Sequence, residues 1–208
     1  LSILALASLA CSLASGGDSK PTEPTTQSNV LFQDDFSNTG SGWDSYRDDE
    51  AITDYDSDGY RIQVLTSNTE LWANPGLNFT DVRVEVDATR TSGPEDNDFG
   101  AICRYQDVDN FYYFIITSDG YYGILKVKDG ESTLLSGEEF GTTDAIVSGK
   151  NHIRADCVGD TLTLTVNGVQ LAQVKDTRFP SGDVGLIAGT YNTPGTDIRF
   201  DDFVVYRP

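Results

Sequence analysis

Apolar and polar residues alternate along the chain from Val30 onward, in short runs separated by glycine, aspartate and asparagine. A period of two is typical of β-strands, and no long run keeps the 3.6-residue period of a helix. The pattern therefore predicts an all-β domain over residues 30–208. The expected strands are Val30–Phe36, Tyr60–Leu65, Thr69–Ala73, Asp81–Thr89, Phe99–Tyr105, Phe111–Thr117, Tyr121–Lys128, Ser132–Leu135, His152–Val158, Thr161–Val166, Val169–Lys175, Val184–Thr190 and Ile198–Tyr206.

Two-residue turns between these runs indicate how the strands pair. Asn-Gly and Asp-Gly pairs accept the positive φ angles of tight hairpin turns, so the strands that flank them should be antiparallel neighbours. Many short strands joined in this way favour two stacked antiparallel sheets, a β-sandwich, with Phe99–Lys128 near its centre. The turn pairs are Asp119-Gly120, Gly159-Asp160 and Asn167-Gly168.

Two of the expected strands differ in how many faces they bury. Thr161–Val166 places leucine and valine on one face and threonine on the other, which is typical of a sheet with one face in water. Phe111–Thr117 is apolar on both faces. We therefore expect the second face of that strand to be covered or to bind a ligand.

The first residues of the chain form an apolar segment, Leu1–Ser15, that is rich in small residues. It is shorter than the ~20 residues of a membrane-spanning helix and is typical of an export signal. No Met begins the sequence and no basic residue precedes Lys20, so we expect the signal to begin upstream of Leu1. Residues 16–29 are rich in Gly, Pro, Ser and Thr, which predicts a disordered stalk.

Within the apolar segment Leu1–Ser15, the sequence Ser8-Leu9-Ala10-Cys11 resembles the lipobox of bacterial lipoproteins. Such proteins are acylated on the cysteine, which anchors them to a membrane without a transmembrane helix. Ser8 stands where the lipobox usually has leucine. Acylation of Cys11 and a plain cleaved signal with an incidental cysteine therefore both stay open.

Acidic residues outnumber basic ones by 33 to 14, and the formal charge is −19. This charge repels phosphate backbones and anionic head groups, so we expect no nucleic-acid partner. The acidity fits a solvated extracellular surface, and it fits Ca²⁺ coordination as well.

Besides Cys11, the chain has two cysteines, Cys103 and Cys157. The export signal directs the chain to an oxidising compartment, where disulfides form and persist. We predict that they are bonded to each other. In the chain-entropy model, closing a loop of this length stabilises the fold by roughly 4 kcal/mol.

A series of short motifs is spread over about Val30–Tyr206. They are Asp34-Asp35-Phe36, Gly42-Trp43, Asp58-Gly59-Tyr60-Arg61-Ile62, Asn151-His152-Ile153-Arg154, Leu162–Gly168, Gly182–Leu186 and Phe200–Val205. In this order they resemble the concanavalin A-like sandwich domains of bacterial exported proteins, similar to the laminin-G-like and 3-keto-disaccharide hydrolase families. The resemblance implies a jelly roll of two antiparallel sheets, one of them curved. It also implies carbohydrate binding by the curved face or its rim loops, sometimes beside Ca²⁺.

The carboxylates of Asp54, Asp56 and Asp58 precede Gly59 with the spacing of a calcium-binding loop. Leu65 stands where an EF-hand has its bidentate Glu, so the loop is not an EF-hand. Ca²⁺ is the one cofactor that the sequence suggests, and a plain acidic turn is the alternative.

A sugar site needs an aromatic platform for the ring and a few hydrogen-bond partners for its hydroxyls. We take as candidates the aromatic side chains of the predicted strands and two cations beside them, although aromatic residues of central strands also pack in cores. The candidates are Trp72, Tyr112 and Tyr122, with Arg104 and Lys126.

Glu85 and Asp87 alternate on one strand face and could also meet a ligand. Laminarinase-type enzymes with this fold carry an E-x-D-x-x-E motif, and here Arg90 stands at the position of the second Glu. His152 has no nucleophile motif beside it. We therefore assign no catalytic residue.

Three functions remain open from the sequence. The first is a non-catalytic binding module, secreted or lipid-anchored at a bacterial cell surface, that binds a glycan or another envelope component. The second is a structural protein that self-assembles into an extracellular layer or fibre. The third, a hydrolase that acts on a modified disaccharide, rests on the family resemblance alone.

Overall fold

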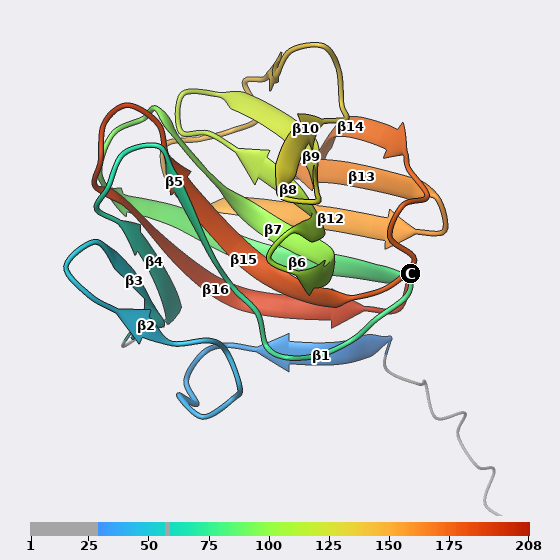
Figure 1. Cartoon of the computed structure of the whole chain (residues 1–208), viewed down its shortest axis with the longest axis horizontal. Helices are drawn as coiled ribbons and strands as arrows, with labels where there is room; N and C mark the ends of the chain where they lie inside the picture. The colour runs from blue at the N-terminus through green and yellow to red at the C-terminus, as the bar shows by residue number, and fades with distance from the viewer. Residues whose placement is uncertain (1–28, 57–58) are drawn as a thin grey trace, which may run out of the picture.

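The computed structural model describes residues 29–56 and 59–208, which form sixteen β-strands and no helix (Figure 1). All strand pairs are antiparallel, as the turn pairs predicted. The strands form two stacked sheets of nine and seven strands. The prediction of an all-β, two-sheet jelly-roll sandwich is confirmed.

The nine-stranded sheet has the order β14-β13-β12-β6-β16-β4-β3-β2, and β1 pairs with β16 beside this path. Its strands are β1 (Val30–Asp34), β2 (Tyr46–Arg47), β3 (Ala51–Asp56), β4 (Gly59–Val64), β6 (Val82–Ser92), β12 (Asn151–Val158), β13 (Thr161–Val166), β14 (Val169–Lys175) and β16 (Thr196–Tyr206).

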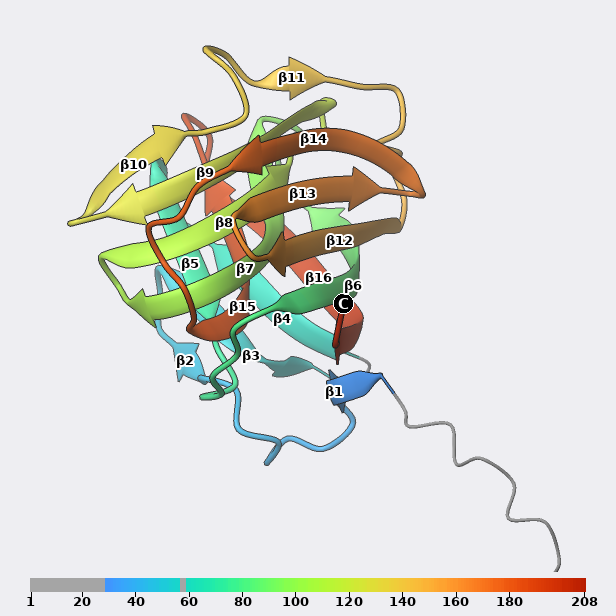
Figure 2. The same cartoon turned by 90° about the vertical axis from the view of Figure 1, so that its right-hand side faces the viewer.

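The seven-stranded sheet has the order β10-β9-β8-β7-β15-β5, and β11 pairs with β9. The two sheets approach each other along one edge, where β14 lies beside β9 (Figure 2). Its strands are β5 (Thr69–Ala73), β7 (Asn97–Asp107), β8 (Asn110–Ile116), β9 (Tyr121–Lys128), β10 (Glu131–Leu134), β11 (Gly141–Thr142) and β15 (Asp183–Thr190).

The predicted strands all exist, and three further strands, β2, β3 and β11, were missed. Asn167 and Gly168 have φ angles of 50° and 83°, the left-handed pair that a tight hairpin needs. The export segment, Cys11 and the stalk up to residue 28 lie outside the described residues, so these predictions stay untested. The described residues contain no helix that is long and apolar enough to cross a membrane.

The main core lies between the sheets and is built from the inward side chains of both. Alternation puts Tyr112, Phe114 and Ile116 of β8 into this core. Cys103 of β7 is bonded to Cys157 of β12, and both residues are fully buried. The predicted disulfide is therefore present and joins the two sheets.

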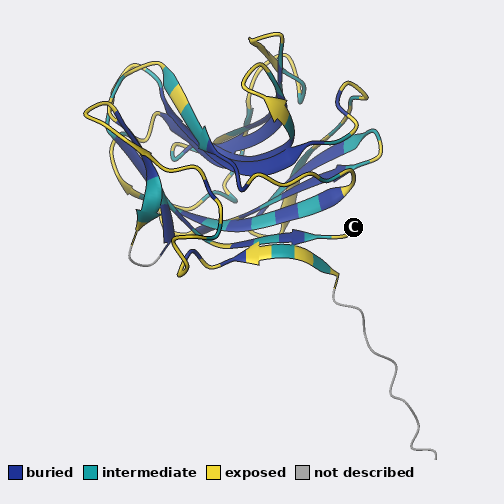
Figure 3. Ribbon diagram, turned by 60° about the horizontal axis from the view of Figure 1, so that its bottom comes forward, coloured by how far each residue is buried: buried dark blue, intermediate teal, exposed yellow. Residues whose placement is uncertain are grey.

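The second apolar face of β8 forms a separate cluster on the outer side of the seven-stranded sheet. Phe111, Tyr113 and Ile115 are each 1% exposed there. Figure 3 shows that the sheet curves around this buried centre, with β5 and β10 on opposite sides of it. We call this outer side the concave face.

Candidate functional site

Two carboxylates lie next to each other on the concave face. Glu70 of β5 and Asp98 of β7 both pair with Gly189 of β15, so the three residues form one row across the sheet. A Cβ atom at position 189 would lie 2.2 Å from Asp98 Oδ1 and 3.0 Å from Glu70 Cγ. Because residue 189 is a glycine and has no side chain, the two carboxylates can occupy the space beside it.

Burial and mutual repulsion perturb the pKa values of Glu70 and Asp98, which we call the acid pair. Burial raises the pKa of Asp98 well above its ordinary value, and the charge of Glu70 raises it further. Burial also raises the pKa of Glu70, which a hydrogen bond from Asp98 partly offsets. Asp98 Oδ2 is buried, and no N–H or O–H group of the described residues donates to it. Both shifts favour a proton shared between the two carboxyl groups, more strongly on Asp98 than on Glu70.

Two tyrosines extend this polar centre. The Tyr113 and Ser132 hydroxyls are 2.7 Å apart, and Tyr113 is also hydrogen-bonded to Glu70. Burial raises the pKa of Tyr191, and the charges of Asp98 and Glu70 add to the effect. Side chains from β5, β7, β8 and β10 and the loop after β15 therefore converge on one acidic spot.

Aromatic rings continue the face along β5 and β7. Trp72 follows Glu70 by two residues, so both side chains point to the same side of β5. The rings of Trp72 and Tyr105 lie 5.5 and 5.4 Å from that of Phe111, and the Trp72 indole donates to the Tyr105 hydroxyl over 3.3 Å. Trp72 and Tyr105 are half-buried, so each leaves part of its ring to solvent.

Two small pockets flank the acid pair. The edge pocket, of about 190 Å³, is lined by Glu70 and Trp72 together with Tyr46, Thr53 and Leu71. The rim pocket, of about 310 Å³, lies at the other side. It is lined by Asp96, Thr117, Asp119, Tyr121, Phe140, Tyr191 and Asn192.

Of the residues predicted for a sugar site, Trp72 lies on the concave face, whereas Tyr112 and Arg104 do not reach a surface. Tyr112 is fully buried between the sheets, where its hydroxyl bonds Asp176 and burial raises its pKa to about 12. Arg104 is 2% exposed and donates to three backbone carbonyls and Asp81. Both side chains are bonded inside the fold, and their contact with a ligand stays a prediction.

Lys126 and Tyr122 lie on the inward side of β9, which alternates with the concave face. Lys126 Nζ is 2.6 Å from Asp176 Oδ2, beside the buried Tyr112. Burial acts to raise the pKa of Asp176, but hydrogen bonds from Lys126 and Tyr112 outweigh it and lower that pKa. Tyr122 packs half-buried against the main core. Neither residue belongs to the concave face.

Glu85 and Asp87 lie together on the outer face of the nine-stranded sheet, opposite to the concave face. Asp87 is 2.5 Å from Lys150 Nζ and 2.8 Å from His152 Nδ1, and His152 Nε2 is 3.6 Å from Glu85. Burial acts to raise the pKa of Asp87, but these hydrogen bonds lower it overall. The predicted carboxylates thus lie in contact with neighbouring side chains, and their role toward a ligand stays a prediction.

The predicted calcium ligands Asp54 and Asp56 lie in strand β3, not in a loop, and Asp56 pairs directly with Gly59. Asp54 accepts hydrogen bonds from Ser45 and Arg47. Asp58 lies outside the described residues. Among the residues that the structure does describe, no group of three or more His, Cys, Asp or Glu side chains is arranged to hold a metal ion. Calcium binding stays a prediction.

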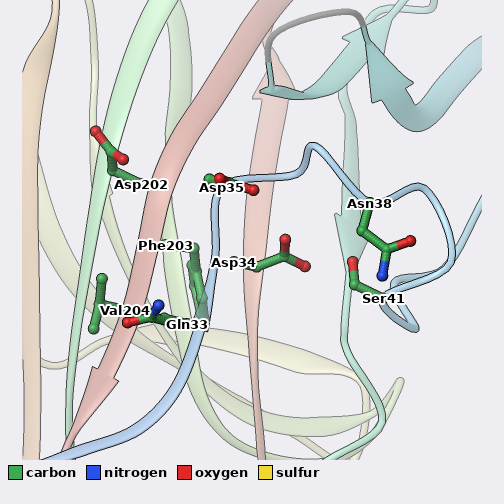
Figure 4. A pocket seen from close by; sticks show the side chains of 8 residues that line it. All are labelled: Gln33, Asp34, Asp35, Asn38, Ser41, Asp202, Phe203 and Val204. Atoms are coloured by element: carbon green, nitrogen blue, oxygen red, sulfur yellow. The ribbon is translucent and has the colours of Figure 1, made fainter.

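A larger pocket of about 470 Å³ lies between β1 and the bulge of β16 (Figure 4). Its most buried carboxylate, Asp34, accepts hydrogen bonds from the Phe36 amide at 2.8 Å and the Trp43 indole at 2.9 Å. Both oxygens of Asp34 therefore hold the start of the domain together. We assign this pocket a structural role.

The sequence did not identify Glu70, Asp98, Tyr105, Phe140 or Tyr191 as site residues. The one available signal was the alternation of Glu70 and Trp72 within the predicted strand Thr69–Ala73. Asp98 stands in the stretch Glu95-Asp96-Asn97-Asp98, where nothing local distinguishes it from its acidic neighbours. The two carboxylates meet because β15 inserts between β5 and β7, an order that local sequence does not reveal.

No family model and no curated protein matches the chain. Solved structures do resemble it. The carbohydrate-binding module CBM66 from Bacillus subtilis superposes with a TM-score of 0.66 at 16% identity, over 80% of this chain and 96% of that one. A Bacillus subtilis protein with a galectin-like fold gives a TM-score of 0.66 at 9% identity, over 85% and 95% of the two chains. The chain has their jelly-roll fold.

A xylan β-1,4-xylosidase from Bacillus halodurans is similar over part of its length. The TM-score is 0.61 at 13% identity, and the match covers 84% of this chain but only 39% of the enzyme. Identities this low show a common fold and no more.

Proposed function

We propose that this domain binds carbohydrate and that the glycan lies on the concave face of the seven-stranded sheet. The observation that carries the proposal is the combination of the Trp72 and Tyr105 rings with the exposed Glu70 carboxylate on one face. A sugar ring stacks its apolar side on such rings and bonds its hydroxyls to such oxygens. Resemblance in fold to a carbohydrate-binding module supports the proposal.

The acid pair favours binding over hydrolysis. Glycosidases hold their two carboxyl groups about 5–5.5 Å apart when they retain configuration, and about 6.5–9.5 Å apart when they invert it. Glu70 and Asp98 are instead in direct hydrogen-bond contact. A glycan hydroxyl can bond to this pair, but a sugar ring does not fit between the two carboxyls.

Export, acylation of Cys11 and attachment to a bacterial membrane complete the proposal and rest on the sequence alone. They would place the domain where glycans of the envelope or of the surroundings are within reach. Self-assembly into a layer or fibre stays a prediction of the sequence as well.

Calorimetric titration of the protein with a panel of neutral oligosaccharides tests the proposal. We expect at least one of them to bind, and Trp72→Ala to weaken its binding at least tenfold, because about 1.4 kcal/mol of stacking is lost. Tyr206→Ala is the matched control, a half-buried aromatic residue of the nine-stranded sheet, and should bind as the wild type does. A panel without any binder, or equal effects of the two substitutions, would reject the proposal.

A further inference from the structure

The rim pocket combines three aromatic side chains that solvent reaches. Tyr121 is 43% exposed and Phe140 is 37% exposed, and the half-buried Tyr191 completes the lining. Large apolar side chains are normally withdrawn from water, and a group of them in a hollow marks a binding site more often than a single one does. The pocket volume of about 310 Å³ is at the lower end of ligand pockets.

Hydrogen bonds of the backbone fix the two segments that carry Tyr121 and Phe140. The short strand β11 pairs with β9, with Gly141 opposite Tyr122 and Thr142 opposite Tyr121, and this pairing fixes the neighbouring Phe140. The Thr143 amide donates to the Gly120 carbonyl at 3.0 Å. The Tyr121 amide donates to Thr117 Oγ1 at 2.8 Å. Because these backbone segments are paired before a ligand arrives, little backbone ordering is needed to bind one.

Polar groups around the rings suit sugar hydroxyls. Asp96 and Asn192 are exposed at the mouth and together offer acceptor and donor atoms. Tyr191 and Asp96 stand two residues from Gly189 and Asp98, which pair with each other in the row of the acid pair. Tyr121 lies on the same side of β9 as Leu125 of the concave face. The rim pocket is therefore one end of the concave face.

The charged side chains that line the rim pocket are all acidic. Its lining includes Asp96 and Asp119, the acid pair lies beside it, and none of the described residues that line it is Lys or Arg. An anionic sugar placed here would meet repulsion without a compensating cation.

We propose that the rim pocket is the subsite that receives an uncharged sugar ring, stacked on Tyr121 and Phe140, and that its carboxylates exclude uronate-containing and sulfated glycans. This inference rests on the proposed function and assigns it a ligand class. The specificity follows from charge, and the affinity follows from the rings.

Titration with matched ligands tests the inference. The panel consists of β-1,4-glucan, β-1,3-glucan and β-1,4-mannan hexasaccharides, and the tightest binder is compared with the same oligosaccharide oxidised to carboxylates at its primary hydroxyls. At low salt we expect the neutral form to bind at least about tenfold more tightly than the oxidised form. The difference in affinity should decrease as salt is added. Asp96→Asn should also reduce the difference in affinity between the neutral and the oxidised ligand. The control is Asp202→Asn, which removes an exposed carboxylate of the nine-stranded sheet and should leave that difference unchanged.

The aromatic variants locate the subsite. Tyr121→Ala and Phe140→Ala should each weaken neutral-glycan binding at least fivefold while the thermal unfolding transition is retained. Tyr121→Phe, which keeps the ring, should bind nearly as the wild type does. Equal affinity for neutral and oxidised ligands, or no effect of the alanine variants, would overturn the inference and leave the concave-face proposal standing. Failure of every oligosaccharide to bind would overturn both.

Discussion

Glu70 and Asp98 face each other across Gly189 and are joined by a hydrogen bond near the β5 edge of a sheet whose concave face carries mainly aromatic and aliphatic side chains. An acid pair with one buried member, Asp98, costs stability, because at neutral pH one proton must be retained or two like charges must lie side by side. Perturbed carboxyl groups of this kind gather at functional sites more often than elsewhere. The pair is thus the strongest polar feature of the concave face.

The acid pair predicts how stability depends on pH. The folded-state pKa values of Asp98 and Glu70 lie above their unfolded values. The pair's contribution therefore favours folding below the unfolded pKa and is lost as pH rises through the folded pKa. Asp98→Asn removes the shared proton, so the variant should gain stability relative to the wild type as pH rises from 4 to 7.

Differential scanning calorimetry at several pH values measures this difference. At pH 7 we expect Asp98→Asn to unfold about 2–4 °C above the wild type, which corresponds to roughly 1 kcal/mol for a domain of this size. At pH 4 the two proteins should unfold at nearly the same temperature. A constant offset across this range would contradict the shared-proton assignment.

Adding a single methyl group at Gly189 should lower the stability of the fold. The Cβ of Gly189→Ala would enter the space of Asp98 Oδ1 and Glu70 Cγ and push the pair apart. We expect a loss of about 1–3 kcal/mol in urea unfolding. Gly149→Ala is the matched control, because nothing lies within 4 Å of its Cβ position. Equal stabilities of the two variants would show that the carboxylates can move aside.

Local patterns in the sequence were enough to predict the strands but not how they are ordered. The alternation in Thr69–Ala73 and the turn at Asn167-Gly168 act over a few residues, and both predictions match the structure. Strand β3 was missed because Asp54 and Asp56 were interpreted as a metal loop, although their i, i+2 spacing also fits one face of a strand.

Distant elements bury two of the predicted site residues. Arg104 and Tyr112 are residue types that often contact ligands, but their partners come from the loops that follow β12 and β14 and from the segment before β6. Their partners stand 23 or more residues away in the chain. Only the three-dimensional structure shows that these polar groups are satisfied inside the protein.

The disulfide predicts a large loss of stability when it is absent. The bond between Cys103 and Cys157 spans 54 residues and links the two sheets. The double variant Cys103→Ala, Cys157→Ala should lose about 4 kcal/mol in urea unfolding, by the entropy of the opened loop. Reduction of the wild type should give a loss of similar size. A change below 1 kcal/mol in both experiments would contradict this account.

Arg104 should be essential for folding and not for binding. Its guanidinium donates at 2.9 Å to the carbonyls of Phe179 and Gly159, and its removal leaves buried acceptors without donors. Arg104→Ala should cost about 3–5 kcal/mol. Arg178→Ala, at an exposed position, should stay within about 0.5 kcal/mol of the wild type. Similar stabilities of the two variants would restore Arg104 as a candidate surface residue.

The chain's two tryptophans allow the most direct test of the concave face as the glycan site. The Trp72 indole lies on that face, whereas the Trp43 indole is buried and bonded to Asp34. A ¹H–¹⁵N spectrum of the ¹⁵N-labelled protein, titrated with the tightest-binding neutral oligosaccharide, follows both indole signals at once, and Trp43→Phe assigns them. We predict a saturable shift of the Trp72 signal and an unchanged Trp43 signal. Binding detected by calorimetry with a Trp72 signal that stays in place would contradict the account and put the glycan on another surface.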